Sequence, residues 1–209
     1  MIKNIIFDLD NTLLFISSEW ESVYQNFINR NNYPITPKDL YMCINTFERN
    51  LKGVVTVKDL ADYINLNLNI NMNEETLEEL LTDYQNIPLI KTDIIYDLLD
   101  YLSKKYKLIV YSNWYTKNQI GRLHNYNLDK FFTNVYGWDV LPIKPSIEGF
   151  KSIIGNDDIK EYVMIGDSME LDLEVPASMG MNTIFYNRKN IEQNTYKEVK
   201  NIEELKNIL

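Results

Sequence analysis

Two aspartates near the start of the chain have the type and spacing of a pair that acts on a phosphate. Asp8 and Asp10 directly follow the apolar run 5–7. A carboxylate can attack phosphorus and form an acyl-phosphate, which water then cleaves. A second carboxyl group nearby can protonate the leaving oxygen and later take a proton from that water. We therefore predict that Asp8 is the nucleophile and Asp10 the general acid and base of a phosphoryl transfer.

Further polar side chains that suit this chemistry stand after later apolar runs or just before a predicted helix: Ser112, Asn113, Lys144, Asp167 and Asp172. A phosphate dianion repels a bare carboxylate, so a hard cation with oxygen ligands must lie between them. Three aspartates, Asp8, Asp167 and Asp172, carry −3 in total, and one Mg²⁺ together with Lys144 restores +3. We predict Mg²⁺ as the cofactor. Ser112, Asn113 and loop amides would supply the hydrogen bonds that hold the phosphate.

These residues can meet only if separate strands bring them to one edge of a sheet. Apolar runs typical of buried strands occur at 5–7, 107–111, 162–165 and 183–186, with a weaker candidate at 134–136. Helical patterns lie between them, near 92–105, 116–126, 146–154 and 171–179. This alternation predicts an α/β fold with a doubly wound, mostly parallel, Rossmann-like sheet. In such a sheet the ligand site lies beyond the carboxyl ends of the strands.

The region from 17 to 87 has a different character, because it carries helix signals and hardly any strand signal. Helices are expected near 18–31, 37–49, 56–67 and 74–86. Ser18 with Glu21 predicts a capping box at the start of the first of these helices. We therefore expect a catalytic α/β core formed by residues 1–16 and 88–209, and a small all-helical cap formed by residues 17–87.

Taken in order, Asp-x-Asp-x-Thr, Ser-Asn, Lys-Pro and Gly-Asp-Ser followed by Asp172 resemble the motifs of the haloacid dehalogenase (HAD) superfamily, phosphatase branch. The resemblance spans residues 5–186, and the helical insertion resembles the type 1 cap of that family. It implies the roles given above for Asp8 and Asp10, and Lys144 as the neutralising lysine.

The same resemblance implies the contacts of the phosphate and the metal. Ser112 would contact the phosphate, with Asn113 beside it. Thr12 would support the turn that positions Asp10 and belong to the phosphate-binding group. Mg²⁺ would be held by the Asp8 carboxylate, the Asp10 main-chain carbonyl and Asp167. Asp172 would lie among these ligands or just behind them.

The second aspartate of the first motif distinguishes two reactions of this family. Dehalogenating relatives lack the second aspartate of the first motif and act on carbon without a metal, so Asp10 argues against that activity.

After Asp172 the family often has a Gly-Ala pair, where this chain has Pro176-Ala177. A proline at this position is expected to disturb the helix.

Composition limits the partners. The net charge is −9 and the pI about 4.7, and a nucleic-acid surface needs a basic face, so we expect no nucleic-acid partner. No apolar stretch approaches the length of a signal peptide or a membrane span. A single cysteine, Cys43, excludes an internal disulfide. We expect a cytoplasmic protein that binds a small phosphorylated metabolite, either as a monomer or as a homodimer.

The favoured function is that of a phosphoric monoester hydrolase, and two alternatives remain. A sugar phosphomutase of the same family needs cationic cap residues, for which Arg49 and Lys52 are candidates. A non-catalytic binding or regulatory protein on the same fold is disfavoured, because every motif residue is present. Phe15, Trp20 and Trp114 lie near the expected mouth of the site. Core packing is favoured for them over stacking on a base or a sugar.

Overall fold

A six-stranded parallel sheet forms the centre of the molecule in a computed structural model, which describes residues 1–17 and 19–209. The strand order is β5-β4-β1-β6-β7-β8, and every neighbouring pair is parallel. The strands are β1 (Asn4–Phe7), β4 (Lys107–Tyr111), β5 (Phe132–Tyr136), β6 (Tyr162–Gly166), β7 (Asn182–Tyr186) and β8 (Lys197–Val199). The predicted α/β fold with a parallel sheet is confirmed.

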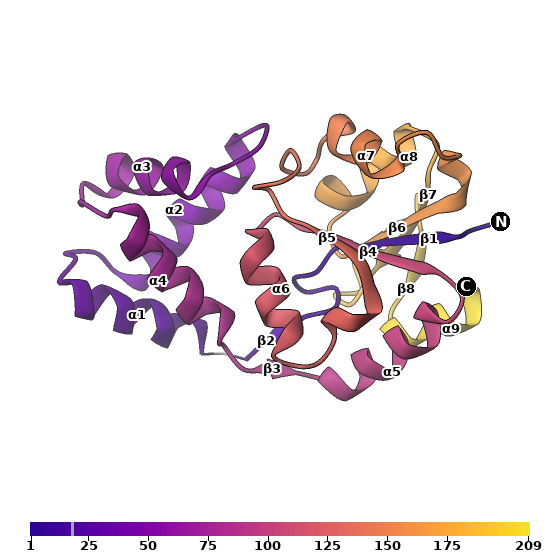
Figure 1. Ribbon diagram of the computed structural model, residues 1–209, viewed down its shortest axis with the longest axis horizontal. Coiled ribbons are helices and arrows are strands. Elements are labelled where there is room, and N and C mark those ends of the chain that lie inside the picture. Colours follow the sequence, from indigo (N-terminus) through magenta and orange to yellow (C-terminus); the bar gives the residue numbers. More distant parts are fainter. Residues whose placement is uncertain (18) are drawn as a thin grey trace.

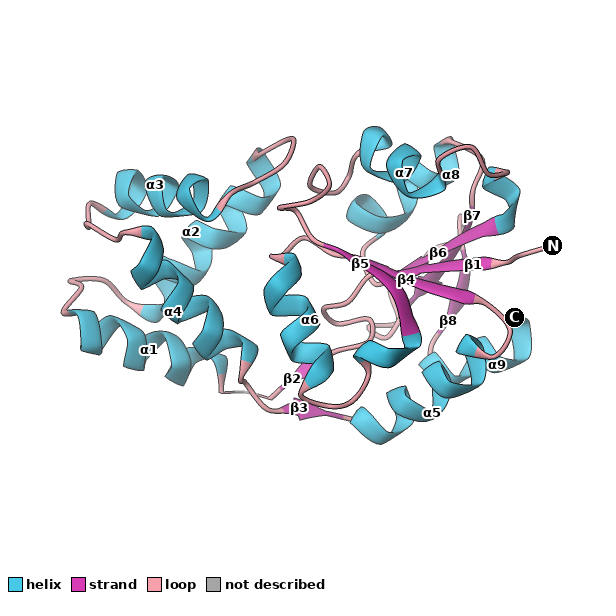
Figure 2. Cartoon of the chain, in the orientation of Figure 1, coloured by secondary structure: helices cyan, strands magenta, loops and turns pink. Residues whose placement is uncertain are grey.

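Helices cover both faces of this sheet (Figure 2). They are α5 (Thr92–Ser103), α6 (Thr116–His124), α7 (Ile147–Ile154), α8 (Glu174–Ser178) and α9 (Leu205–Ile208). Alternate residues of β1 enter different clusters, because successive strand side chains point to opposite faces. Ile5 and Phe7 pack with α5 and α9, whereas Ile6 packs with α7. The central strand is therefore buried on both sides, which explains its uninterrupted apolar run.

Two parts of the core differ from the sequence prediction. The helix expected near 171–179 is divided into a π-helical turn (Met169–Leu173) and the short helix α8. Pro176 lies in the first turn of α8, where a backbone N–H has no intrahelical partner, so the proline costs little there. Strand β8 and helix α9 were not predicted, because they have only three and four residues and carry too little periodicity. Short 3₁₀ turns (Asp129–Phe131, Ile159–Glu161 and Ile202–Glu204) complete the core.

Four helices form a lobe at one side of the core (Figure 1). They are α1 (Trp20–Asn31), α2 (Pro37–Asn50), α3 (Val57–Leu68) and α4 (Glu74–Gln85), close to the predicted ranges. Thr36 and Thr56 form capping boxes that start α2 and α3. The capping box expected at Ser18 lies outside the described residues. That residues 17–87 form a domain of their own stays a prediction.

Among its contacts with the core, the lobe is attached at its chain crossings and through a loop on the opposite side. The antiparallel pair β2 (Phe15–Ile16) and β3 (Leu89–Ile90) carries both chain crossings. On the other side, the loop between α2 and α3 is hydrogen-bonded to the loop after β5. The Val55 amide donates to the Trp138 carbonyl at 2.7 Å, and the Ile143 amide donates to the Gly53 carbonyl at 2.8 Å. Trp138 is fully buried in the hydrophobic cluster of the lobe. The lobe is therefore held over the carboxyl edge of the sheet.

Among the described helices, none combines the length and the apolar character that crossing a membrane requires.

Candidate active site

The loop after β1 holds the first two aspartates in a tight turn. The Leu9 carbonyl accepts hydrogen bonds from the amides of Thr12, Leu13 and Leu14. Asn11 has a φ of 63°, a left-handed conformation that asparagine tolerates better than most residues. Thr12 is fully buried, and its hydroxyl donates to Asp8 Oδ2 at 3.0 Å. Thr12 therefore orients the Asp8 carboxylate from behind and does not line the cavity in front of it.

Lys144 connects two of the predicted carboxylates. Its Nζ donates to Asp8 Oδ1 at 2.7 Å and to Asp172 Oδ1 at 2.6 Å, and only 2% of its side chain is exposed. Asp172 Oδ2 also accepts from the Ser168 amide at 3.0 Å. Burial alone would lower the pKa of Lys144, but the charges of Asp172 and Asp8 hold it above its ordinary value. The lysine is therefore a fixed positive charge beside Asp8.

Glycine at the end of β6 permits this arrangement. A Cβ at Gly166 would lie 2.2 Å from Asp172 Oδ2 and 2.4 Å from its Cγ. Contacts that short do not occur, so any other residue here would displace Asp172 and with it the partner of Lys144.

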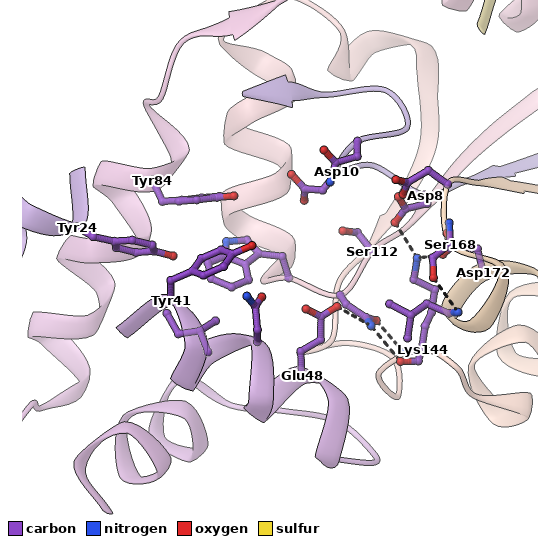
Figure 3. A pocket seen from close by; sticks show the side chains of 17 residues that line it. Asp8, Asp10, Tyr24, Tyr41, Glu48, Tyr84, Ser112, Lys144, Ser168 and Asp172 are labelled. Carbon is purple, nitrogen blue, oxygen red and sulfur yellow. Dashed lines mark hydrogen bonds and ion pairs between the residues drawn. The ribbon is translucent and has the colours of Figure 1, made fainter. Parts of the chain in front are cut away.

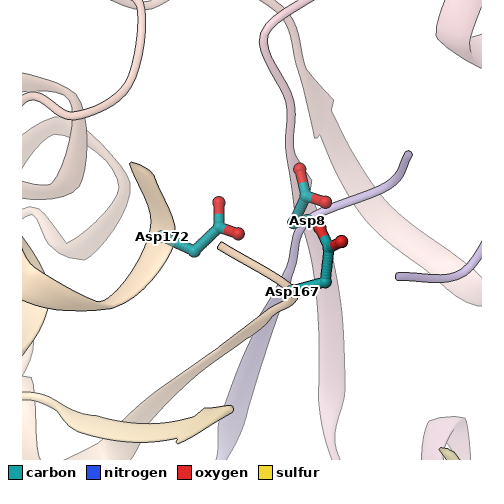
Figure 4. Close-up of side chains that lie close together, drawn as sticks. All are labelled: Asp8, Asp167 and Asp172. Carbon is teal, nitrogen blue, oxygen red and sulfur yellow. The ribbon is translucent and has the colours of Figure 1, made fainter. Parts of the chain in front are cut away.

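Three carboxylates converge at the edge of the sheet, from Asp8, Asp167 and Asp172 (Figure 4). Each offers one oxygen, and these oxygens lie within 4.8 Å of one another. Burial raises the pKa of Asp8 to about 7, with Lys144 opposing the shift. Burial and the charge of Asp8 raise the pKa of Asp167 to about 6. Burial also raises the pKa of Asp172, against the effect of Lys144.

The charge balance of this cluster fits a divalent cation. Three buried or half-buried carboxylates face one lysine, and Arg188 contributes only a long contact of 3.7 Å to Asp167. Burial is the main cause of the raised pKa values and the neighbouring carboxylates add to it, so a bound cation would lower the cost of holding these charges together. Oxygen donors at this spacing are the ligands that hard cations prefer. The residues present are therefore suited to hold the metal that the sequence predicted.

Asp10 is held by two residues of α6 that the sequence analysis did not single out. Arg122 Nη1 donates to Asp10 Oδ1 at 2.7 Å, and Gln119 Nε2 donates to Asp10 Oδ2 at 2.9 Å. Gln119 Nε2 also donates to the Ser112 hydroxyl at 2.8 Å. Arg122 is only 1% exposed, and its guanidinium lies over the ring of Tyr84. The helix therefore fixes the orientation of Asp10 and links it to Ser112.

The remaining predicted residues lie in the same site. Ser112 is buried and lines the cavity beside Asp8 and Asp10. Asn113 also lines it, but its amide is engaged by protein groups: Nδ2 donates to the Lys144 carbonyl at 3.0 Å, and Oδ1 accepts from the Lys144 amide at 2.7 Å. Asn113 therefore positions the loop that carries Lys144.

A cavity of about 280 Å³ opens in front of these residues (Figure 3). Asp8, Lys144 and Asp172 lie at one end of it. The lobe supplies the other end, with Tyr24, Tyr41 and Tyr84, and Glu48 lies between these rings and Lys144. The core side thus offers several carboxylates and a fixed cation, and the lobe closes the space above them.

The model of the haloacid dehalogenase-like hydrolase family matches residues 5–186, which is most of the chain. The chain belongs to this family. It is therefore a HAD-family hydrolase, and the resemblance inferred from the motifs is confirmed.

Individual HAD relatives point to more than one reaction. A stretch of 105 residues is 32% identical to the pyrimidine 5′-nucleotidase PynA of Streptococcus pneumoniae, covering 48% of this chain and 44% of that protein. The match thus spans less than half of that relative. The structure of Bacillus subtilis YfnB bound to magnesium superposes with a TM-score of 0.74 at 20% identity, over 99% of this chain and 98% of the other.

The 2-haloacid dehalogenase of Pseudomonas syringae pv. tomato DC3000 also superposes with a TM-score of 0.74, at 18% identity over 100% of this chain and 98% of the other. At such low identity the structural matches show the shared fold alone. The reaction must be inferred from the residues of the site.

Proposed function

We propose that this hydrolase is a Mg²⁺-dependent phosphatase that cleaves a small phosphorylated metabolite through an aspartyl-phosphate on Asp8. The observation that carries the proposal is the meeting of Asp8 with Lys144, Asp167 and Asp172 in a cavity that Asp10 also lines. The partial match to a protein named a nucleotidase supports a phosphatase as well, since a nucleotidase acts on a phosphate ester.

The residues of the chain account for both halves of such a reaction. An Asp8 oxygen forms a bond to phosphorus as the bond between phosphorus and the leaving oxygen breaks, and Asp10 gives that oxygen a proton. In the second half Asp10 takes a proton from water, the water oxygen bonds to phosphorus, and the Asp8 carboxylate leaves. Lys144 holds Asp8 in place and offsets its charge, while Ser112 is placed to contact the phosphate.

Mg²⁺ would be held by Asp8, Asp167 and the Asp10 main-chain carbonyl, with Asp172 among the ligands or just behind them. When bound, the ion would neutralise the repulsion between the phosphate and the carboxylates. Because both oxygens of Asp172 already accept hydrogen bonds, from Lys144 and from the Ser168 amide, a place just behind the ligands suits it better.

The alternatives have less support. A dehalogenase has no use for Asp10, which here is anchored at the cavity by Arg122. For a mutase, the sequence offered Arg49 and Lys52 as contacts for a second phosphate. Neither lines the cavity in front of Asp8, and Lys52 borders a different hollow on the lobe.

Replacing the nucleophile tests the proposal. Asp8→Asn keeps the shape of the side chain but removes its nucleophilic oxygen, so phosphate release from acetyl phosphate in Mg²⁺ should fall by roughly a thousandfold or more. The matched control is Asp62→Asn, which removes an exposed carboxylate on the lobe and should leave the rate at the wild-type value. Comparable turnover by Asp8→Asn would contradict the proposed mechanism.

A further inference from the structure

The walls of the cavity carry little positive charge. Among the described residues that line it, Lys144 is the one cation, and Asp8 and Asp172 already pair with it. Arg122 lies behind Asp10 and over the ring of Tyr84, and it does not line the cavity. A leaving group that bears a carboxylate or a second phosphate would find no counter-charge. The lining therefore favours a leaving group without negative charge.

A carboxylate on the lobe strengthens this conclusion. Glu48 of α2 lines the cavity, and burial raises its pKa. Its Oε1 accepts from Asn113 Nδ2 at 3.2 Å, while Oε2 has no hydrogen-bond partner in the described part of the chain. Glu48 is half-buried, and its Oε2 is open to a hydrogen-bond donor that enters the cavity. Hydroxyl groups of a leaving group would donate to this oxygen, whereas a leaving group that bears a carboxylate would bring a second acidic group next to Glu48.

Aromatic rings line the part of the cavity farthest from Asp8. Tyr24, Tyr41 and Tyr84 border both this cavity and a second hollow of about 410 Å³, which Trp20 also lines, so the two spaces adjoin. Trp20 and Tyr41 lie 4.7 Å apart between ring centroids, and Tyr24 and Tyr84 lie 6.4 Å apart. Tyr41 is 40% exposed, so its ring is open to a ligand. Flat aromatic surfaces favour stacking on another planar ring.

Polar atoms on these walls are also free to bind. The hydroxyls of Tyr24, Tyr41 and Tyr84 and the amide of Asn45 make no hydrogen bond to any described residue, and all four side chains line the cavity. In Figure 3 the three tyrosines stand together at the end opposite Asp8, with Glu48 between them and Lys144. A ligand that fills the space would meet carboxylates first, then a hydrogen-bonding zone, then aromatic rings.

The order of carboxylates, hydrogen-bonding groups and aromatic rings along the cavity matches the order of a phosphate, a sugar and a base in one ligand. On the basis of the proposed phosphatase function, we propose that the substrate is a nucleoside 5′-monophosphate, with Glu48 accepting hydrogen bonds from the sugar hydroxyls and Tyr41 stacking on the base. The sugar spans the zone between Asp8 and the tyrosines. Tyr24, Tyr84 and Trp20 complete the aromatic enclosure.

A three-substrate comparison tests the substrate class. Uridine 5′-monophosphate has all three parts, ribose 5-phosphate lacks the base, and phosphoglycolate replaces sugar and base with a carboxylate. We expect kcat/KM to be highest for uridine 5′-monophosphate, lower for ribose 5-phosphate and lowest for phosphoglycolate. The nucleotide should exceed ribose 5-phosphate by at least about tenfold, because base stacking contributes on that scale. Equal or better use of ribose 5-phosphate or phosphoglycolate would overturn the assignment.

Two variants assign the contacts. Tyr41→Ala should lower kcat/KM for the nucleotide by about tenfold and change that for ribose 5-phosphate much less. Glu48→Lys should reverse the charge preference, raising kcat/KM for phosphoglycolate relative to ribose 5-phosphate. Glu75→Gln, an exposed change on α4, is the control and should keep the wild-type ratios. Equal losses on all substrates in Tyr41→Ala, or no change of preference in Glu48→Lys, would refute these roles.

A binding measurement separates this inference from the reaction mechanism. In Asp8→Asn, tryptophan fluorescence titrated with uridine 5′-monophosphate and with ribose 5-phosphate should show tighter binding of the nucleotide. Asp8-dependent hydrolysis of acetyl phosphate without any nucleotide preference would refute the substrate class and leave the phosphatase function standing. Nucleotide binding without Asp8-dependent hydrolysis of any ester would refute the phosphatase function instead.

Discussion

Asp167 lies near other carboxylates, and its raised pKa makes the stability of the metal-free protein depend on pH. Its pKa rises from 3.8 to about 6 because of burial and the charge of Asp8. A raised carboxyl pKa means that the folded state binds the proton more tightly than the unfolded state. The stability from this proton is present below pH 3.8 and is lost as the pH rises through 6. Above that pH the ionised Asp167 destabilises the metal-free fold.

Removing the charge should therefore stabilise the metal-free protein. With a shift of this size, and with the Asp167 side chain 14% exposed, Asp167→Asn should gain about 2–3 kcal/mol at pH 7.5 in EDTA, or roughly 5 °C in Tm. The gain should shrink at pH 4.5, where wild-type Asp167 is protonated, and Mg²⁺ should stabilise the wild type more than the variant. Thermal unfolding followed by circular dichroism measures both. A lower Tm for the variant at pH 7.5 in EDTA would contradict the argument.

Among the elements, the junction of β6 with the π-helical turn is tightly constrained, because Gly166 and Asp172 occupy neighbouring space. Gly166→Ala should displace Asp172 from Lys144. We expect at least about a tenfold loss of phosphatase activity and a loss of about 1–3 kcal/mol in the free energy of unfolding.

A double-mutant cycle isolates this cause. The added Cβ would also lie 2.5 Å from the Asp172 Cβ, so the background must lack that atom as well. If the clash with Asp172 is the reason, adding Gly166→Ala to Asp172→Gly should destabilise far less than adding it to the wild type. Chemical denaturation of the four proteins gives the coupling energy. Equal costs in the two backgrounds would show that Gly166 is needed for another reason.

For the molecule as a whole, the sequence predicted the half of the site that the sheet assembles. Asp8 and Asp167 follow buried strands, and the carboxyl ends of parallel strands meet at one edge. The roles of Gln119 and Arg122 could not be predicted, because polar residues on a helix carry no sign of which face meets Asp10. Gly166 stood out as the first residue of the Gly-Asp-Ser motif, but its need for space could not be predicted, because it arises from the way the Asp172 side chain lies against the end of β6.

The lobe half of the site depends on docking. Glu48 and Tyr41 reach the cavity because the lobe is held over the core by β2, β3 and the contacts of Trp138. Helical periodicity predicted the four helices but not how the lobe lies on the core. All three aromatic residues expected to serve packing do so: Phe15 is buried in the core cluster, and Trp114 and Trp20 pack against the lobe cluster. Trp114 and Trp20 also border the cavities. The proposed chemistry therefore follows from the order of motifs, and the proposed substrate class follows from tertiary contacts.

The measurement that tests the central claim most directly is the trapping of phosphate on Asp8. Asp10→Asn should slow hydrolysis of the acyl-phosphate, because no base activates the water, while acetyl phosphate needs no acid to leave. After incubation with radiolabelled acetyl phosphate and Mg²⁺ and an acid quench, Asp10→Asn should carry hydroxylamine-sensitive label on the peptide that contains Asp8. The Asp8→Asn, Asp10→Asn double variant should carry none. Label elsewhere, or equal label in the double variant, would contradict the account.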